Sequence, residues 1–399
     1  MLPKFFLPLL SLFVLIFSNA LYADKKLSIS GEAGLEFRAF SDDPLNPAQH
    51  GNNSSFFIKT ELFYRFNKRW TLTFTPFARV DQGDNKRTHA DVRELLFHKT
   101  AAKWELKLGV SKVFWGVTES QHLVDIINQT DAIEASDREE KLGQTLTQLI
   151  LKRKSGIWEF FLLPGFRERT FPSINGRPRS TPIVDRSLTQ YEASSGRSHI
   201  DYAFRWSKNI GIWDVGLSYF DGTSRDPRFI PQLNNGSLVL APFYDQIQQT
   251  GLDIQATKGN WLWKLESIYR QGQEQAYTAV TAGFEYTVTG FMKTRADLGI
   301  LLEYLYDERQ DPLKTPFEDD TFLGFRMTFN DAKSSALLLG FIFDNNSNER
   351  SSFVEYTRRL GQSWKLSVEG RFLSNPNVGG VLYSLRQDNF LQVQLSYFF

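Results

Sequence analysis

Residues 390–399, at the end of the chain, alternate strictly between apolar and polar side chains. Leu391 and Val393 fall on one face of the predicted strand, and Gln392 and Gln394 fall on the other, because successive side chains of a strand point to opposite faces. In a soluble sandwich the apolar face would be buried, whereas in a transmembrane barrel it faces lipid and the polar face lines the lumen. The alternation therefore predicts a strand but leaves its surroundings open.

Segments with the same period recur from residue 26 to the end of the chain, separated alternately by short and long connections. The short connections carry Gly, Asn or Ser beside Lys or Arg; they lie at 67–69, 100–103, 154–156, 207–211, 258–260, 289–294, 330–334 and 360–363. The long connections lie at 41–53, 82–88, 114–143, 167–196, 223–246, 271–275, 307–318, 346–350 and 374–387. This order predicts an all-β, antiparallel up-and-down barrel of about 18 strands (16–20) with both termini on the short-turn side. The stretch 237–246 keeps the number open, because it fits either a strand or a loop.

The tryptophans favour a transmembrane barrel over a soluble sandwich. Six of them lie close to a short turn, at the start of the outgoing strand: Trp70, Trp104, Trp158, Trp213, Trp261 and Trp364. A ring of indoles at one level is typical of the interface between membrane and water. The short turns are then expected on the periplasmic side and the long loops on the extracellular side.

The amino terminus has the layout of a secretory signal peptide. Lys4 precedes an apolar stretch, and small residues follow at Ala20 and Ala23. We therefore expect residues 1–23 to be removed, with cleavage after Ala20 or Ala23, and residues 24–399 to form the barrel. A membrane anchor is the alternative, but the stretch is short for a hydrocarbon core of ~30 Å.

The composition narrows the remaining classes. The chain has no cysteine, so an exported protein of this kind has no disulfide bonds to stabilise it. Aromatic residues make up 15% of the chain at a mean hydropathy of −0.33, a combination that suits aromatic girdles around a polar lumen. After the amino terminus, the longest clean apolar run, 336–343, is too short for a spanning helix. The formal net charge of +1 indicates no preference for nucleic acid.

With these features the chain resembles the bacterial outer-membrane porin-type barrels. The resemblance rests on the signal peptide, the absence of cysteine, the alternating connections and the final Tyr397-Phe398-Phe399. It implies assembly into the bacterial outer membrane, among lipids and lipopolysaccharide, with Tyr397 and Phe399 in the signal that the barrel-assembly machinery reads. The chain is also similar to uncharacterised outer-membrane barrels in which a strand ends in Trp-Gly, here Trp115-Gly116, before a loop of the pattern Asp-x-x-Asn-x-x-Asp.

Loop 114–143 is the most distinctive connection. Thr118 with Gln121, and Ser136 with Glu139, form two capping-box patterns that predict helical turns. The apolar side of a short helix would be formed by Leu123, Ile126 and Ile127. A loop with such an apolar side is suited to folding inward against the barrel wall, where it would narrow the channel.

Folded inward, this loop would set acidic side chains against a basic wall. The acidic residues expected at the constriction are Asp125, Asp131, Glu134, Asp137 and Glu139. The basic residues expected on the lumen wall are Arg38, Arg65, Arg79, Arg93, Lys264, Arg270, Arg326 and Arg371. Such an arrangement produces a transverse field that orients dipolar or ionic solutes. The alternatives are a charged loop exposed to solvent and a Ca²⁺ site built from Asp125, Asn128 and Asp131.

Two further patterns bear on function. The connection at 167–196 is rich in arginine, including Arg167 and Arg177, and would either bind anions such as lipopolysaccharide phosphates or form a solvated face. Ser120 and His122 lie close in sequence, but residues two apart do not by themselves present a base to a nucleophile.

The sequence therefore predicts a non-enzymatic, monomeric or homo-oligomeric (trimeric) outer-membrane channel. A small polar or charged solute would pass through it passively, with loop 114–143 as the constriction, without cofactor or metal. Because the lumen charges have mixed sign, sharp ion selectivity is not expected. One alternative is an outer-membrane component of an export or lipid-transport system, sealed by ion pairs until a partner engages it. The other is a membrane-embedded hydrolase.

Overall fold

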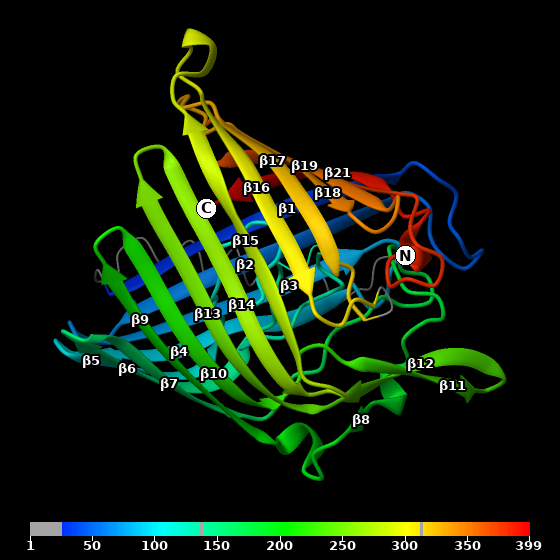
Figure 1. Ribbon diagram of the computed structural model, residues 1–399, viewed down its shortest axis with the longest axis horizontal. Helices are drawn as coiled ribbons and strands as arrows, with labels where there is room; N and C mark the ends of the chain where they lie inside the picture. Colours follow the sequence, from blue (N-terminus) through cyan, green and yellow to red (C-terminus); the bar gives the residue numbers. More distant parts are fainter. Residues whose placement is uncertain (1–25, 136, 138, 312–313) are drawn as a thin grey trace.

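Strands that are neighbours in the barrel pair antiparallel all the way round, so that one 18-stranded sheet closes on itself (Figure 1). The computed structural model describes residues 26–399 apart from 136, 138 and 312–313, and the predicted signal peptide, 1–23, lies outside the described residues. The barrel strands are β1 (Leu27–Phe40), β2 (Asn53–Arg65), β3 (Trp70–Asp81), β4 (His89–Thr100), β5 (Trp104–Ser111), β6 (Gln144–Arg153), β7 (Gly156–Pro164), β9 (Ile200–Ile210), β10 (Trp213–Thr223), β13 (Gln246–Lys258), β14 (Trp261–Gly272), β15 (Tyr277–Val288), β16 (Asp297–Asp307), β17 (Asp319–Thr328), β18 (Ala336–Asp344), β19 (Arg350–Leu360), β20 (Trp364–Ser374) and β21 (Phe390–Phe398). The predicted all-β barrel and its strand number are confirmed.

The two faces of the wall differ as the alternation predicts. On β14, Trp263 is 46% exposed on the outer face, whereas Lys264 and Glu266, at 8% and 0%, point inward. An apolar exterior around a polar interior is the arrangement of bacterial outer-membrane barrels, in which lipid covers the outer face. Among the described residues no helix is long and apolar enough to cross a membrane.

The barrel closes between its first and last strands. The register of β1 with β21 runs from Glu32–Phe398 to Phe40–Phe390. Gly31 extends the ladder by exchanging two backbone hydrogen bonds with Phe399, at 2.9 and 3.1 Å. A Cβ on Gly31 would lie 2.4 Å from the Phe399 ring, so the ring packs where only glycine leaves room.

The connections also follow the predicted order. The long loops gather at one end of the barrel, at the right of Figure 1, and the short turns at the other. All six tryptophans named above lie at or near the first residue of a strand that leaves a short turn. The loops also contain short 3-10 turns at Arg186–Leu188, Gly196–Ser198, Phe291–Lys293 and Tyr383–Leu385.

The uncertain stretch 237–246 is resolved as part of a hairpin outside the barrel. It contains β12 (Ser237–Tyr244), which pairs with β11 (Arg228–Asn234) and with the short β8 (Gln190–Tyr191) in a separate three-stranded sheet. Asn235 and Gly236 form the turn of the hairpin with positive φ angles of 51° and 78°. The hairpin projects beyond the long-loop end of the barrel (Figure 1).

Candidate functional site

Residues 112–143, called here the lumen loop, leave the wall after β5 and return to it at β6. Asn128, which is 1% exposed, holds the base of the loop together. Its side-chain oxygen accepts a hydrogen bond from the Val113 amide (2.8 Å), and its amide group donates to the carbonyls of Ser111 (2.9 Å) and Leu142 (2.8 Å). One buried amide side chain therefore ties the outgoing and returning ends of the loop to each other.

The first half of the lumen loop packs on the inner wall through an apolar cluster. Val124 and Ile127 are fully buried, and Ile126 is 2% exposed. The cluster joins Trp115, Leu123, Val124, Ile126 and Ile127 of the loop to Leu146, Phe161, Leu163, Ala203, Phe220, Ile247, Ile268, Tyr277 and Ala279. Because Ile268 follows Glu266 by two residues on β14, it shares the inward face of that strand. The loop thus lies inside the barrel against one side of its wall.

The helix expected in this loop is not formed, and that prediction is wrong for the described residues. Residues 112–135 contain no helix; apart from the isolated β-bridge of Thr130 with Lys141 they form turns, bends and irregular backbone, and Ser136 of the second capping box lies outside the described residues. In the first box, the Thr118 hydroxyl lies 2.5 Å from the Gln121 carbonyl, and the Thr118 amide donates to Glu266. Because a wall carboxylate takes up the amide hydrogens of this segment, the segment does not need a helix to satisfy them.

Two wall carboxylates hold the loop backbone. Glu266 accepts hydrogen bonds from the amides of Val117 (2.6 Å), Thr118 (3.0 Å) and Val124 (3.2 Å). On β16, Glu303 accepts from the amides of Glu119 (2.8 Å) and Ser120 (2.9 Å) and from the Ser120 hydroxyl. Hydrogen bonds to an ionised acceptor are the stronger kind, so these two clamps fix residues 117–124 on the wall.

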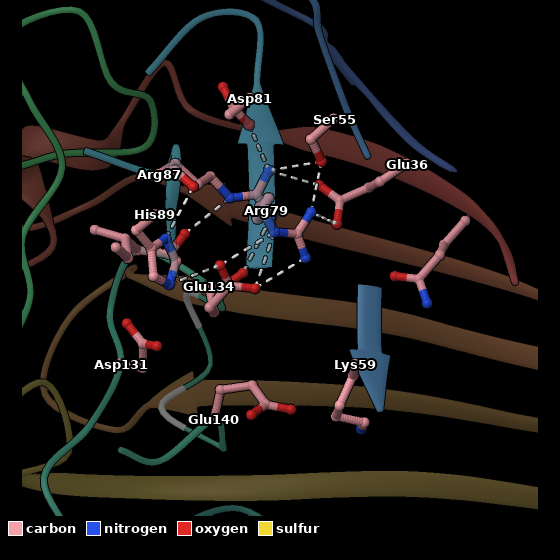
Figure 2. Close-up of polar contacts among 12 residues, drawn as sticks. Glu36, Ser55, Lys59, Arg79, Asp81, Arg87, His89, Asp131, Glu134 and Glu140 are labelled. Atoms are coloured by element: carbon pink, nitrogen blue, oxygen red, sulfur yellow. Dashed lines mark hydrogen bonds and ion pairs between the residues drawn. The ribbon is translucent and has the colours of Figure 1, made fainter. Parts of the chain in front are cut away.

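The second half of the lumen loop reaches β1 and β3 through a buried ionic cluster, drawn in Figure 2. Arg79 binds Glu134 of the loop at 2.9 Å and Glu36 of β1 at 3.1 Å. Arg87 binds the other oxygen of Glu36 at 2.8 Å and Asp81 at 2.9 Å. The side chains of these five residues are at most 6% exposed. Each arginine therefore serves two carboxylates, which compensates for the loss of water around the charges.

Single ion pairs join the lumen loop to other parts of the wall. Asp131 binds Arg93 of β4 at 2.5 Å. Asp137 binds Arg371 of β20 at 2.8 Å. Glu119 of the loop binds Arg326 of β17 at 2.5 Å and lies 3.8 Å from Lys264 of β14. Together with the clamps and the ionic cluster, these contacts connect the loop to strands on most sides of the lumen.

The structure brings most of the sequence-predicted residues together but differs in their exposure. Asp125, Asp131 and Glu134 have side chains that are 1%, 0% and 6% exposed, so they are buried in ion pairs and do not face an opening. Asp137 and Glu139 retain exposures of 18% and 56%. On the wall, the buried residues are Arg38, Arg79, Arg93, Lys264 and Arg270, and the more exposed ones are Arg65, Arg326 and Arg371. Arg65 lies at the short-turn end of β2.

The expected Ca²⁺ arrangement is not formed. Asp125 binds Lys141 at 3.1 Å, the oxygen of Asn128 is occupied by an amide, and Asp131 faces Arg93. Among the described residues no group of three or more His, Cys, Asp or Glu side chains is placed to hold a metal ion. The three oxygens predicted as ligands therefore serve the loop architecture.

Ser120 and His122 turn to different partners. The Ser120 hydroxyl donates to Glu303 at 2.6 Å, whereas His122 lies 3.4 Å from Glu139 and 3.7 Å from Glu266. Burial alone would lower the pKa of His122, but its ion pairs with the two carboxylates raise that pKa to about 10. His122 is therefore a cation at neutral pH and not a general base.

The arginine-rich connection 167–196 is largely paired with carboxylates. Arg177 binds Asp388 at 2.7 Å, and both side chains are at most 2% exposed. Arg186 binds Glu168 at 3.0 Å, and Arg169 binds Asp226 at 2.6 Å. The Arg177–Asp388 pair draws this loop onto the connection between β20 and β21.

Sequence reasoning did not single out Glu266, Glu303 or Arg87, and it considered Asn128 only as a Ca²⁺ ligand and not as the residue that holds the base of the loop. In the sequence, Glu266 and Glu303 are charged residues in the middle of alternating apolar segments. The sequence does not predict their partners, because each carboxylate binds the backbone of a loop more than 140 positions away in the chain.

Solved structures similar to this chain include outer-membrane proteins. The trimer form of OmpT, an outer membrane protein of Vibrio cholerae, aligns over 94% of this chain and 99% of its own with a TM-score of 0.48 and 9% identity. A mutant of the Rh. blastica porin aligns over 94% of this chain and 100% of its own, with a TM-score of 0.45 and 11% identity. Similarity at this level carries no argument about function, and the fold assignment rests on the strand topology. No protein-family model and no curated protein matches the chain.

Proposed function

We propose that this barrel is a passive, non-enzymatic outer-membrane channel for small polar or charged solutes, with the lumen loop as its constriction. The observation that carries the proposal is the position of the loop, which lies within the lumen and is anchored by Glu266, Glu303 and Asn128. A loop fixed at several points narrows a pore to a defined size, which a mobile loop does not.

The path for solute runs between the lumen loop and strands β17–β20. On the opposite side, along β6–β15, the apolar cluster fills the space, and the ionic cluster around Arg79, on β1 and β3 near β20, is almost completely buried. Along β16–β18 a second apolar cluster of Leu301, Leu305, Phe322 and Ile342 is also buried, and the charged side chains nearer the short turns of β17 and β19 keep more contact with solvent, because Arg326 is 36% and Glu355 40% exposed. Exposed charges inside a barrel mark the part of the lumen that water reaches.

This path has an excess of carboxylates and therefore prefers cations. Its acidic side chains are Glu119, Asp137, Glu139, Glu285, Glu355 and Glu369, and its basic side chains are His122, Lys264, Arg326 and Arg371. A ring of mostly acidic groups raises the local concentration of cations. Since Arg326 and Arg371 lie among the carboxylates, the preference is modest.

Recording of single channels in planar bilayers tests both claims. We expect a steady unit conductance. In a salt gradient we expect a reversal potential of the sign that indicates preferential passage of cations. The double variant Glu139→Gln/Glu355→Gln should move the reversal potential toward the value for anion preference, whereas Asp43→Asn, an exposed carboxylate in the connection between β1 and β2 and outside the barrel strands, should leave it nearly unchanged. A correctly folded protein without conductance would remove the channel proposal.

The assembly signal and the partners belong to the same proposal. Tyr397 and Phe399 would be read by the barrel-assembly machinery, and the apolar exterior would contact outer-membrane lipids and lipopolysaccharide. Association into a homo-oligomer stays a prediction, which the mass of the detergent-solubilised protein tests.

A further inference from the structure

The barrel wall has a recess on its outer face, between β4 and the start of β6. Its volume is about 510 Å³, which is within the range of ligand-binding pockets. The residues that line it are Pro76, Phe77, Ala90, Asp91, Val92, Val110, Gly143, Thr145 and Arg167. Ala90 and Thr145 are exposed, and the register of the strands places Val110 beside Thr145 on the outer face. The recess is therefore mainly apolar and opens away from the lumen.

The recess exists because β5 is short. This strand has 8 residues, whereas β13 has 13, and its register with β4 begins only at the pair Leu95–Val110. Beyond that pair, β3 is the strand that pairs with the outer part of β4 among the described residues, because the chain turns into the lumen after Ser111. The wall has a notch at this place.

The notch lies within the thickness of the membrane. At about 3.4 Å per residue and a tilt of about 40°, β5 rises by roughly 18 Å from Trp104, which starts the strand beside a short turn. The apolar band of such barrels is about 25 Å high, so β5 ends roughly 7 Å below its outer edge. Acyl chains of the outer leaflet therefore reach the notch.

Arg167 closes the inner side of the notch. Its guanidinium donates to the Gly143 carbonyl at 3.0 Å and to Asp91 at 2.9 Å, and Arg93 also lies 3.2 Å from Asp91. These bonds use two of the five N–H donors of Arg167, and its side chain remains 34% exposed. A cationic donor thus stands beside an apolar recess at the level of the outer leaflet.

We propose that the recess binds an anionic, acylated lipid of the outer leaflet. The acyl chain lies against Pro76, Ala90, Val92 and Val110, and the head group accepts hydrogen bonds from Arg167. This proposal is independent of whether the lumen conducts.

Native mass spectrometry tests the site in two arms. In the first, the barrel is purified from membranes in a mild detergent, and we expect one anionic acylated lipid per chain, whose mass identifies it. In the second, barrel refolded in lipid-free detergent is titrated with palmitate and with hexadecanol. We expect one palmitate per chain, bound at least tenfold more tightly than hexadecanol, since only palmitate carries a charged head group.

Variants separate a specific site from general coating by lipid. Val92→Trp should fill the recess and reduce retention at least tenfold, whereas Val393→Trp, on the outward face of β21, should retain the lipid. Arg167→Gln should bind palmitate and hexadecanol about equally. Ala90→Phe is a second filling variant in case Val92→Trp does not fold, which the mobility of unheated samples on a gel reports. Equal retention by the wild type and a folded filling variant, or no retained lipid in either arm, would overturn the proposal.

Discussion

At the scale of single residues, charge in this barrel is used to hold a loop. Glu266 is fully buried but receives backbone amides, a hydroxyl and the charge of His122. His122 in turn stands between Glu266 and Glu139 and carries a raised pKa, so the three form a chain of alternating sign. Removal of one member of such a buried group of charges costs free energy, because the charges that remain lose their partner in a place that water reaches poorly.

The titration of His122 gives a prediction for pH. Because its folded pKa, about 10, lies above the ordinary value of 6.5, its contribution to loop stability is complete below pH 6.5 and is lost as the pH rises through 10. We expect protection of residues 117–124 from proteolysis to be constant below about pH 6.5, to fall steadily above that pH, and to lose the His122 contribution by about pH 10.

His122→Gln isolates this contribution from other groups that titrate in alkali. The difference in protection between the wild type and this variant should be largest below about pH 6.5 and should vanish above about pH 10. A difference that persists unchanged at pH 11 would assign the protection to packing and not to charge.

At the scale of elements, the lumen loop and the wall form one unit. The loop has almost no regular secondary structure, yet its backbone is satisfied by wall side chains, and its apolar residues pack on inward-facing residues of β6–β15. Its conformation therefore depends on the wall. An isolated peptide of this sequence would not adopt it, because its contacts are long-range.

Removal of the clamps should release the loop. In Glu266→Gln and Glu303→Gln the side chain keeps its shape but loses the charge, and one of its two acceptor oxygens is replaced by an NH₂ group that cannot accept a hydrogen bond from a backbone N–H. Hydrogen bonds to a charged group contribute about 1.5–3 kcal/mol each, so we expect the double variant to open the loop more easily by about 3 kcal/mol. Cleavage by thermolysin within 117–124 should then rise on the order of a hundredfold.

The control for this experiment is Glu61→Gln, which removes an inward carboxylate of β2 that lies outside the loop contacts described above. Mass spectrometry of the cleaved products locates the cut. If the double variant is cut no faster than the control, the apolar cluster and Asn128 hold the loop without the carboxylates.

At the scale of the whole molecule, stability comes from closure of the sheet. The barrel has no disulfide, and the described residues form one continuous ladder whose last bond joins β1 to β21. Closure leaves no free edge along most of the wall, and a free edge in lipid is unfavourable. The notch beside β5 is an exception among the described strands, and Arg167 lies against it, bound to the Gly143 carbonyl and to Asp91.

A variant of Phe399 tests the closure of the barrel and its assembly together. Its backbone completes the ladder with Gly31, and its ring fills the space above that glycine. Phe399→Ala should lower the fraction of protein that reaches the heat-modifiable, folded form severalfold, measured by gel mobility of unheated membranes. Phe66→Ala, an exposed aromatic residue in a short turn on the same side, should have little effect. Equal assembly of the two variants would contradict a special role of the terminal residue.

The sequence by itself determined the barrel. Period-two alternation, turn residues and tryptophans beside the short turns are local signals, and they were enough to predict the class of fold, the strand number, the side of each loop and the inward face of residues such as Arg79 and Arg371. These properties follow from the geometry of a strand, in which the position of a residue decides its face.

Tertiary structure alone decided the site. Asp131 and Glu134 looked like residues at an opening, but they are buried because wall arginines from β3 and β4 lie opposite them. The predicted helix was replaced by an irregular segment because Glu266 and Glu303 satisfy its backbone. Both outcomes depend on pairings across the lumen, between residues far apart in the chain, and no local pattern in the sequence specifies which side chains meet there.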